Sequence, residues 1–361
     1  MKNFLLLLAL LICIAAVLAF TGIKTLISPV SPVTEILEET ESWEINDSVY
    51  TIAFYNVENL FDIYDDPRTN DNQFLPEGSK NWTKERYEKK LSDIGKVIEK
   101  LGDDNGPEIL GLCEVENRKV LSDLVDQKTI KDRNYQIIHF DSPDVRGIDV
   151  ALIYKENAFR PFTQRAFAIK DFAETRMRTR DILLVGGKVG RDTIFILVNH
   201  WPSRIGGEEK TEDKRILVAG VVKSLTDSLK SLYPSAAYLV MGDFNDEPGN
   251  ASIDKVLLAS NHIDIADTSF YNPFYSLYRE GRGTYKYRSN WNMLDQIIIS
   301  GSLIDSMRYV SYKDNAAAIY DPIWLYTKND PTKGPFKTYS GSKYFGGYSD
   351  HLPVYINLCP N

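Results

Sequence analysis

Several apolar segments of this sequence begin or end in residues that can bind a metal ion or transfer a proton. The clearest is "YSDHLPVYINL" near the end of the chain, where Asp350 and His351 stand directly before an apolar run. Five other segments carry a carboxylate, an amide or an imidazole in the same kind of position. Together these residues are Asn56, Glu58, Glu114, His200, Asp243, Asn245, Asp295, Asp350 and His351. The set suits hydrolysis of a phosphate ester, which needs a bound cation, an oriented water and donors for developing negative charge.

The oxygen-bearing members of this set predict a hard divalent cation, Mg²⁺, with Mn²⁺ or Ca²⁺ as alternatives. Glu114 follows the apolar run "EILGLC" and is the first candidate ligand. Asn56, Asp350 and Glu58 are the further candidates, by direct contact or through water. A bound cation would also reverse the local field of a chain whose net charge is −8, so that an anionic substrate can approach.

The remaining members of the set can activate water and stabilise charge. Asp243 with Asn245, in "GDFND", suits the orientation and deprotonation of the attacking water. His200 and His351 are candidate donors to the phosphoryl oxygens. A histidine that must keep one charge state needs a carboxylate partner, and Asp295 can serve His351 in that way.

Two arginines are candidate contacts for the substrate phosphate, because a guanidinium offers paired donors to phosphate oxygens. Arg204 lies four residues after His200, beside a Gly-Gly pair, and Arg146 precedes the apolar run "IDVALIYK". Three more arginines alternate in "ETRMRTRD", which is typical of a solvated strand edge; they are Arg176, Arg178 and Arg180.

The order of these motifs resembles that of the endonuclease/exonuclease/phosphatase superfamily, which includes deoxyribonuclease I, apurinic endonucleases, inositol polyphosphate 5-phosphatases and neutral sphingomyelinases. The resemblance runs from about Val49 to Leu358, through "NVEN", "CEVEN", "NHWPSR", "GDFND", "LDQI" and "SDHLPV". It implies a four-layer sandwich, with two packed mixed β-sheets flanked by helices, and a Mg²⁺-dependent phosphodiesterase or phosphatase.

The resemblance also implies residue roles. Glu114 would be the principal metal ligand with Asn56 beside it, and Asp350 would lie next to the metal or the water. Asp243 and Asn245 would orient the nucleophile and the phosphate, while Asp295 would pair with His351. At the position of His200 some relatives carry a histidine and others a tyrosine. The histidine here resembles the deoxyribonuclease-like and sphingomyelinase-like branches of the superfamily.

The elements that must position these residues alternate along the chain. Apolar runs of strand character occur around residues 50–57, 107–115, 135–140, 148–155, 181–189, 192–201, 237–245, 294–300 and 352–358. Helical periodicity spans 82–101, with Thr83 as the expected N-cap, and 213–232. The run 182–200 leaves no room for a helix between its two strands and predicts a hairpin. Antiparallel pairs of this kind favour an α+β fold over a doubly wound sheet.

The N-terminus predicts export. Residues 1–23 contain one lysine before an uncharged apolar run, which suits either a cleaved signal peptide or an uncleaved membrane anchor. Residues 24–47, with two Ser-Pro steps, predict a flexible linker, and 48–361 a single catalytic domain. The expected location is therefore periplasmic or extracellular. Only two cysteines lie beyond residue 23, too few for a disulfide framework, and Cys113 is expected in the core.

Two kinds of substrate remain open from the sequence. The first is nucleic acid, cleaved by an exported endonuclease; the acidic balance and the absence of a basic helix count against it. The second is a small or lipid phosphate ester, such as an inositol phosphate or a sphingomyelin-like headgroup. A non-catalytic binding module ranks last, because every residue of the expected catalytic set is present. No obligate protein partner is expected, and the sequence predicts a monomer.

Overall fold

The structure is a computed structural model of the 361-residue chain, and it describes residues 49–102, 104–171, 175–262 and 270–361. The predicted signal or anchor at 1–23 and the predicted linker at 24–47 lie outside the described residues. Among the described residues, no helix combines the length and apolar character that crossing a bilayer requires.

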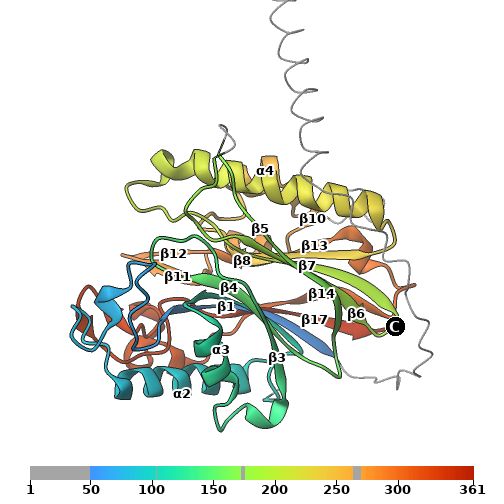
Figure 1. Cartoon of the computed structure of the whole chain (residues 1–361). Coiled ribbons are helices and arrows are strands. Elements are labelled where there is room, and N and C mark those ends of the chain that lie inside the picture. The colour runs from blue at the N-terminus through green and yellow to red at the C-terminus, as the bar shows by residue number, and fades with distance from the viewer. Residues whose placement is uncertain (1–48, 103, 172–174, 263–269) are drawn as a thin grey trace, which may run out of the picture. The chain divides into compact units, whose positions relative to one another are not determined.

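Two mixed sheets form the centre of the molecule (Figure 1). In the first, β1 pairs in parallel with β2 and antiparallel with β17. Its strand order is β14 (Val310–Ile319), β17 (Val354–Pro360), β1 (Tyr50–Leu60), β2 (Ile109–Val115), β4 (Asp149–Lys155) and β3 (Tyr135–His139). In the second sheet, β8 pairs in parallel with β7 and antiparallel with β13. Its order is β5 (Arg160–Phe167), β6 (Ile182–Val189), β7 (Asp192–His200), β8 (Ala237–Asp243), β13 (Asp295–Ser300), β10 (Phe270–Tyr271) and β9 (Ala259–Ser260).

Helices cover the outer faces of both sheets (Figure 1). On the side of the first sheet lie α2 (Lys84–Lys100) and α3 (Arg118–Val125), and over the second sheet lies α4 (Glu208–Leu232). Smaller elements complete the fold: α5 (Tyr275–Arg279) and the hairpins β11 (Tyr285–Tyr287) with β12 (Asn290–Asn292) and β15 (Tyr339–Ser340) with β16 (Lys343–Tyr344). The four-layer α+β sandwich predicted from the sequence is confirmed.

The alternation of side chains in the second sheet determines which residues face the first sheet. In β13, Ile297 and Ile299 belong to the core between the two sheets, whereas Ile298 packs in the outer core with α4. This is the two-residue period of a strand. The sheets approach closely at Gly111 in β2, where a Cβ atom would lie 2.6 Å from Met241 Sδ. Glycine at this position therefore allows the inner faces of the two sheets to pack together.

The predicted strands and the hairpin at 182–200 are all present, and Thr83 is the N-cap of α2. The strand β5 was not predicted, because it is an edge strand with a largely polar, exposed sequence, "RPFTQRAF". The helix α3 was not predicted either, because its 8 residues show little periodicity. Cys113 is buried and unpaired, as expected for a small core residue.

Candidate active site

Three strand ends of the second sheet bring His200, Asp243 and Asp295 side by side. In the register of the sheet, His200 at the end of β7 lies opposite Asp243 at the end of β8. Asp295 at the start of β13 lies opposite Asp243 from the other side. All three continue the alternation that faces inward, so their side chains point toward the first sheet. The strand order alone therefore assembles half of the predicted site at one edge.

His351 completes this group and is paired with Asp295. His351 Nδ1 lies 2.6 Å from Asp295 Oδ2, and His351 Nε2 lies 3.9 Å from Asp243 Oδ2. Burial alone would lower the pKa of His351, but the charge of Asp295, its hydrogen bond, and the charges of Asp243 and Asp350 raise that pKa well above its ordinary value. The imidazole is therefore a cation near neutral pH and presents its Nε2 proton to the site.

His200 has the opposite charge state. Its Nε2 lies 3.7 Å from Asp243 Oδ2 and 4.0 Å from Glu114 Oε1. Burial, followed by the positive charges of Arg180, Arg146 and His351, lowers the pKa of His200 well below its ordinary value. A neutral imidazole beside a cationic one can donate a hydrogen bond to a phosphate oxygen without adding a second buried charge.

Asp243 occupies the centre of the group and is held by two donors. Asn56 Nδ2 donates to Asp243 Oδ2 at 3.1 Å, and the backbone N–H of Asn245 donates to Asp243 Oδ1 at 2.9 Å. Asn245 has a φ of 49°, a left-handed conformation that asparagine tolerates, and its side-chain amide donates to the Trp201 carbonyl. Burial raises the pKa of Asp243 to about 6. At pH 7 the carboxylate is thus ionised and more basic than an ordinary aspartate.

Glu114 and Asp350 are the carboxylates best placed to hold a cation. Glu114 Oε2 accepts a hydrogen bond from the Asn59 N–H at 2.9 Å, which leaves Oε1 directed toward His200. In the described part of the chain, no hydrogen bond occupies the Asp350 carboxylate. The pKa of Asp350 is raised to about 7. Burial is the main cause, followed by the negative charge of Glu58 and, more weakly, that of Glu114, whereas the positive charge of His351 acts in the opposite direction.

A divalent cation fits these groups, because it would neutralise carboxylates that otherwise repel one another in a poorly solvated site. Glu114 and Asp350 would hold it, and a cation bound there would polarise a phosphate oxygen. The Asn56 side-chain oxygen, predicted as a further ligand, accepts a hydrogen bond from the Glu58 N–H at 3.0 Å, so a cation would have to share it. The ligand atoms of Asp243, Asp295 and His351 lie within 4.8 Å of one another, but Asp295 and His351 are hydrogen-bonded to each other.

The Glu58 carboxylate lies near Asp350, on whose pKa it acts, but both of its oxygens are engaged by backbone N–H groups. Its Oε2 accepts a hydrogen bond from the Thr338 N–H at 2.6 Å, and its Oε1 accepts one from the Tyr339 N–H at 3.0 Å. These bonds attach the segment before Asp350 to the end of β1. The structure therefore gives Glu58 a supporting role that was not predicted, and its role as a metal ligand stays a prediction.

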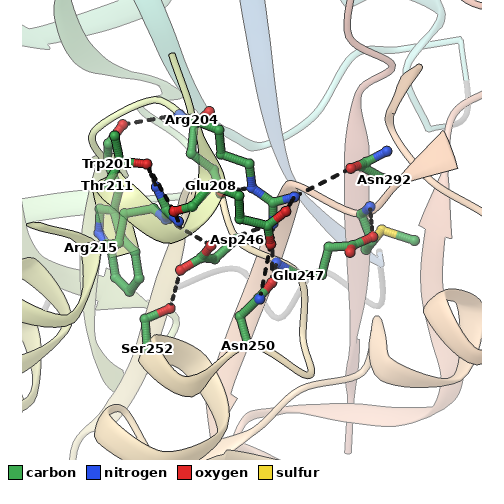
Figure 2. Close-up of polar contacts among 12 residues, drawn as sticks. Trp201, Arg204, Glu208, Thr211, Arg215, Asp246, Glu247, Asn250, Ser252 and Asn292 are labelled. Atoms are coloured by element: carbon green, nitrogen blue, oxygen red, sulfur yellow. Dashed lines mark hydrogen bonds and ion pairs between the residues drawn. The ribbon is translucent and has the colours of Figure 1, made fainter. Parts of the chain in front are cut away.

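Arg204 is likewise engaged by the protein (Figure 2). Its Nε donates to the Asn245 carbonyl at 2.6 Å, and its terminal nitrogens contact Asn250 at 3.1 Å and Glu208 at 3.1 Å. Arg204 and the fully buried Arg215 both contact the Asp246 carboxylate, at 3.4 Å and 2.7 Å. These contacts replace the predicted phosphate contact of Arg204, because its guanidinium is engaged by protein oxygens. Arg204 instead holds the turn that carries Asn245. The Asp246 carboxylate anchors Arg204 in that position, a role that was not predicted for Asp246.

Arg180 is a functional residue that the sequence analysis missed. Arg176 and Arg178 are exposed as predicted, but Arg180 is buried behind the site, so the prediction of a solvated edge is wrong for this residue. Its guanidinium donates to the carbonyls of His200 and Trp201, at 3.1 and 2.6 Å, and to Asp144 Oδ2 at 3.1 Å. Its position immediately before an apolar strand was the one available signal.

Arg146 lies on the loop that Asp144 anchors. Its backbone N–H donates to Asp144 Oδ1 at 2.9 Å, while its side chain is 42% exposed. Because Arg180 binds the other oxygen of Asp144, the Arg180–Asp144 pair connects the loop of Arg146 to the strand end of His200. Arg146 therefore remains available for the substrate, as the sequence analysis predicts.

We expect Arg180→Gln to lower the free energy of unfolding by about 3–5 kcal/mol, because it removes the buried charge partner of Asp144 and leaves only the partly exposed Arg146 at 3.8 Å. Arg178→Gln, at an exposed position two residues away, should change it by less than about 0.5 kcal/mol. Urea denaturation followed by circular dichroism measures both values. Equal stability of the two variants would contradict the supporting role of Arg180.

The comparisons with known proteins agree with this geometry. Residues 51–359 match the Endonuclease/Exonuclease/phosphatase family. No curated protein matches the chain. Among solved structures, D. rerio TDP2 complexed with a single strand DNA product is 13% identical, with a TM-score of 0.52, and the match covers 86% of this chain and 99% of that one. Truncated Caenorhabditis elegans TDP2 is 14% identical, with a TM-score of 0.51 and coverage of 87% and 99%.

A Bacteroides thetaiotaomicron protein described as an endonuclease/exonuclease/phosphatase family protein is 15% identical, with a TM-score of 0.52 and coverage of 88% and 99%. At these identities the likeness shows a shared fold, and the family match covers nearly the whole described chain. The fold, the family match and the grouping of carboxylates with two histidines point to one conclusion. The chain belongs to the endonuclease/exonuclease/phosphatase family and is a metal-dependent phosphodiesterase.

Proposed function

We propose that this protein is an exported, Mg²⁺-dependent phosphodiesterase that hydrolyses nucleic acid. The observation that carries the proposal is the assembly of His200, Asp243 and Asp295 at adjacent strand ends, with His351 paired to Asp295. In this arrangement Asp243 accepts a proton from the attacking water, and His351 donates to the phosphoryl oxygens. His200 contributes a neutral donor on the opposite side of Asp243.

Magnesium is the proposed metal because the available ligand atoms are oxygens. Glu114 and Asp350 provide carboxylates, and Asn56 provides an amide oxygen. Mg²⁺ typically takes one or two carboxylates and keeps water and substrate oxygens in its other positions. Mn²⁺ or Ca²⁺ can replace it in such a site.

Nucleic acid is the proposed substrate because an aromatic and basic hairpin adjoins the catalytic group. The Tyr285 ring lies 4.8 Å from the His351 ring, and Tyr285 begins the hairpin formed by β11 and β12. At the tip, Tyr287 is 57% exposed and Arg288 lies 5.2 Å from its ring. Exposed aromatic rings beside arginine form stacking surfaces for unpaired bases. The similar D. rerio TDP2 structure, which holds a single strand DNA product, supports the same choice.

We expect residues 46–361 to cleave a single-stranded oligonucleotide in the presence of Mg²⁺. EDTA should lower the rate more than about 100-fold, because the cation stabilises the negative charge of the transition state by several kcal/mol. Gel analysis of the products measures the rate, and adding back Mg²⁺ should restore it. Turnover of bis-p-nitrophenyl phosphate without cleavage of the oligonucleotide would instead favour a small or lipid phosphate ester. Oligonucleotide cleavage unaffected by EDTA would contradict the proposed metal dependence.

Export is part of the same proposal and is supported by the apolar N-terminal sequence at 1–23. Fractionation of the producing cells, with mass spectrometry of the N-terminus, tests it. A mature protein that begins after this segment indicates a cleaved signal, and a full-length protein in the membrane fraction indicates an anchor. Recovery of the full-length chain only with soluble cytoplasmic proteins would contradict export.

A further inference from the structure

A polar pocket of about 170 Å³ opens next to the catalytic group. It lies between the segment that follows β1 and the loop that precedes β4. Phe61 and Phe74 line it with stacked rings whose centroids are 4.3 Å apart. Two cationic side chains, Lys80 and Arg146, line it from different segments of the chain. No acidic side chain is among its lining residues.

The pocket adjoins the catalytic group through Asn59. Asn59 lines the pocket, and its backbone N–H donates to the Glu114 carboxylate at 2.9 Å. Arg146 is close enough to His200 for its charge to contribute to the lowered pKa of that imidazole. Lys80, on the other side, interacts electrostatically with Asp350. A ligand in the pocket would therefore lie beside a phosphate held by a cation at Glu114 and Asp350.

The charge of the pocket is positive in a protein that is acidic as a whole. Lys80 Nζ donates to the Gly341 carbonyl at 2.7 Å and lies 4.7 Å from the Tyr339 ring and 5.5 Å from the Phe74 ring. In the described part of the chain, no carboxylate lies within ion-pair distance of Lys80. Arg146 has one partial partner, Asp144 Oδ1 at 3.8 Å from its Nε. Both cations thus retain donors for an anion.

We propose that this pocket binds a second phosphate group of the substrate, next to the phosphate that is hydrolysed. The inference rests on the proposed function, because it assigns the pocket to a substrate that carries more than one phosphate. Lys80 and Arg146 bind the second phosphate with charge-assisted hydrogen bonds, and the Asn59 segment separates it from the metal ligands. The second phosphate is either the neighbouring linkage of a nucleic-acid strand or a terminal phosphate monoester.

Paired substrates that differ by one phosphate test the pocket. For the terminal source, the pair is the thymidine dinucleotide with and without a 5′-phosphate. For the internal source, the pair is the thymidine trinucleotide whose neighbouring linkage is a phosphodiester or an uncharged methylphosphonate. In at least one of the two pairs, we expect the wild-type kcat/KM to be about tenfold or more higher for the substrate that carries the additional phosphate charge. Each charge-assisted hydrogen bond contributes about one order of magnitude in affinity. Lys80→Gln and Arg146→Gln should each lower that ratio, whereas Lys84→Gln, at an exposed helix position paired with Glu88, should not.

Binding without turnover provides an independent measurement. Calorimetry with Mg²⁺ compares thymidine 3′,5′-bisphosphate with thymidine 5′-monophosphate, two monoesters that a phosphodiesterase does not hydrolyse. The bisphosphate should bind more tightly to wild type and lose that advantage in Lys80→Gln. If wild type cleaves no phosphodiester but shows this binding difference, the proposed function fails and the pocket assignment stands. If neither assay shows a preference for the second phosphate, or if the preference survives both substitutions, the pocket assignment is overturned. Thermal melting of each variant reports whether the fold is retained.

Discussion

Asp243→Asn should lower kcat on bis-p-nitrophenyl phosphate by about 10²–10⁴-fold, the range typical of a lost general base. Asparagine preserves the shape of the side chain but cannot accept a proton from water at neutral pH. Asp243 is also the residue that touches most of the group, because Asn56, the Asn245 backbone, His200 and His351 all approach its two oxygens. Its removal therefore disturbs both the base and the orientation of its neighbours.

The matched control for this substitution is Asp227→Asn on the exposed face of α4, where Asp227 pairs with Lys223. We expect this control to retain the wild-type kcat, and we expect both variants to keep the wild-type circular dichroism spectrum. A folded Asp243→Asn enzyme within about threefold of the wild-type kcat would remove Asp243 from the chemistry, since a lost base must cost more than that.

His351→Gln should lower kcat by about 10²–10³-fold, because glutamine can donate to Asp295 but cannot supply a cationic donor. Asp295→Asn should have an effect of similar size. It removes the charge that contributes most to raising the pKa of His351, so the imidazole becomes neutral near pH 7. If the two residues act as one unit, the double variant should be little slower than the slower single variant. Single-turnover kinetics of all four enzymes measures this coupling.

The chain offers a matched control pair in the first sheet. His139 Nε2 lies 2.9 Å from Asp149 Oδ2, and both side chains are buried, as in the catalytic pair. His139→Gln removes an equally buried imidazole on the edge strand β3, and we expect it to affect stability with little loss of kcat. Effects of His351→Gln and Asp295→Asn that multiply independently would contradict the proposed pairing in catalysis.

The strand ends show how much of the site could be predicted. His200, Asp243 and Asp295 each adjoin an apolar run, and the two-residue period of those runs already assigns a common face to residues such as Ile297, Ile299 and Asp295. The strands and the two long helices were predicted correctly because buried segments carry a periodic pattern of apolar residues, and this pattern is visible in the sequence. The short helix α3 and the polar edge strand β5 lack such a pattern.

The arginines show what could not be predicted. Arg204 stands beside a catalytic motif and resembles a phosphate ligand, but the structure surrounds its guanidinium with protein oxygens. Arg180 stands in a polar alternating segment and resembles a surface residue, but its donors hold the carbonyls of His200 and Trp201. Whether a guanidinium is free depends on acceptors that other segments bring to it, and these are not encoded in its neighbours.

The sequence by itself determined the family, the layers of the fold and the residue types available for catalysis, because these follow from local patterns and from the order of motifs. Only the tertiary structure decided the role of each group. Glu58 accepts hydrogen bonds from the backbone amides of Thr338 and Tyr339, which are 280 and 281 positions away in the chain, so its oxygens hold a distant segment beside the site. His351 is cationic and His200 is neutral, although both are buried imidazoles, because Asp295 pairs with His351 whereas Arg180 and Arg146 lie near His200. A charge state reflects the surrounding charges and solvent exposure, and both are set by packing between distant segments.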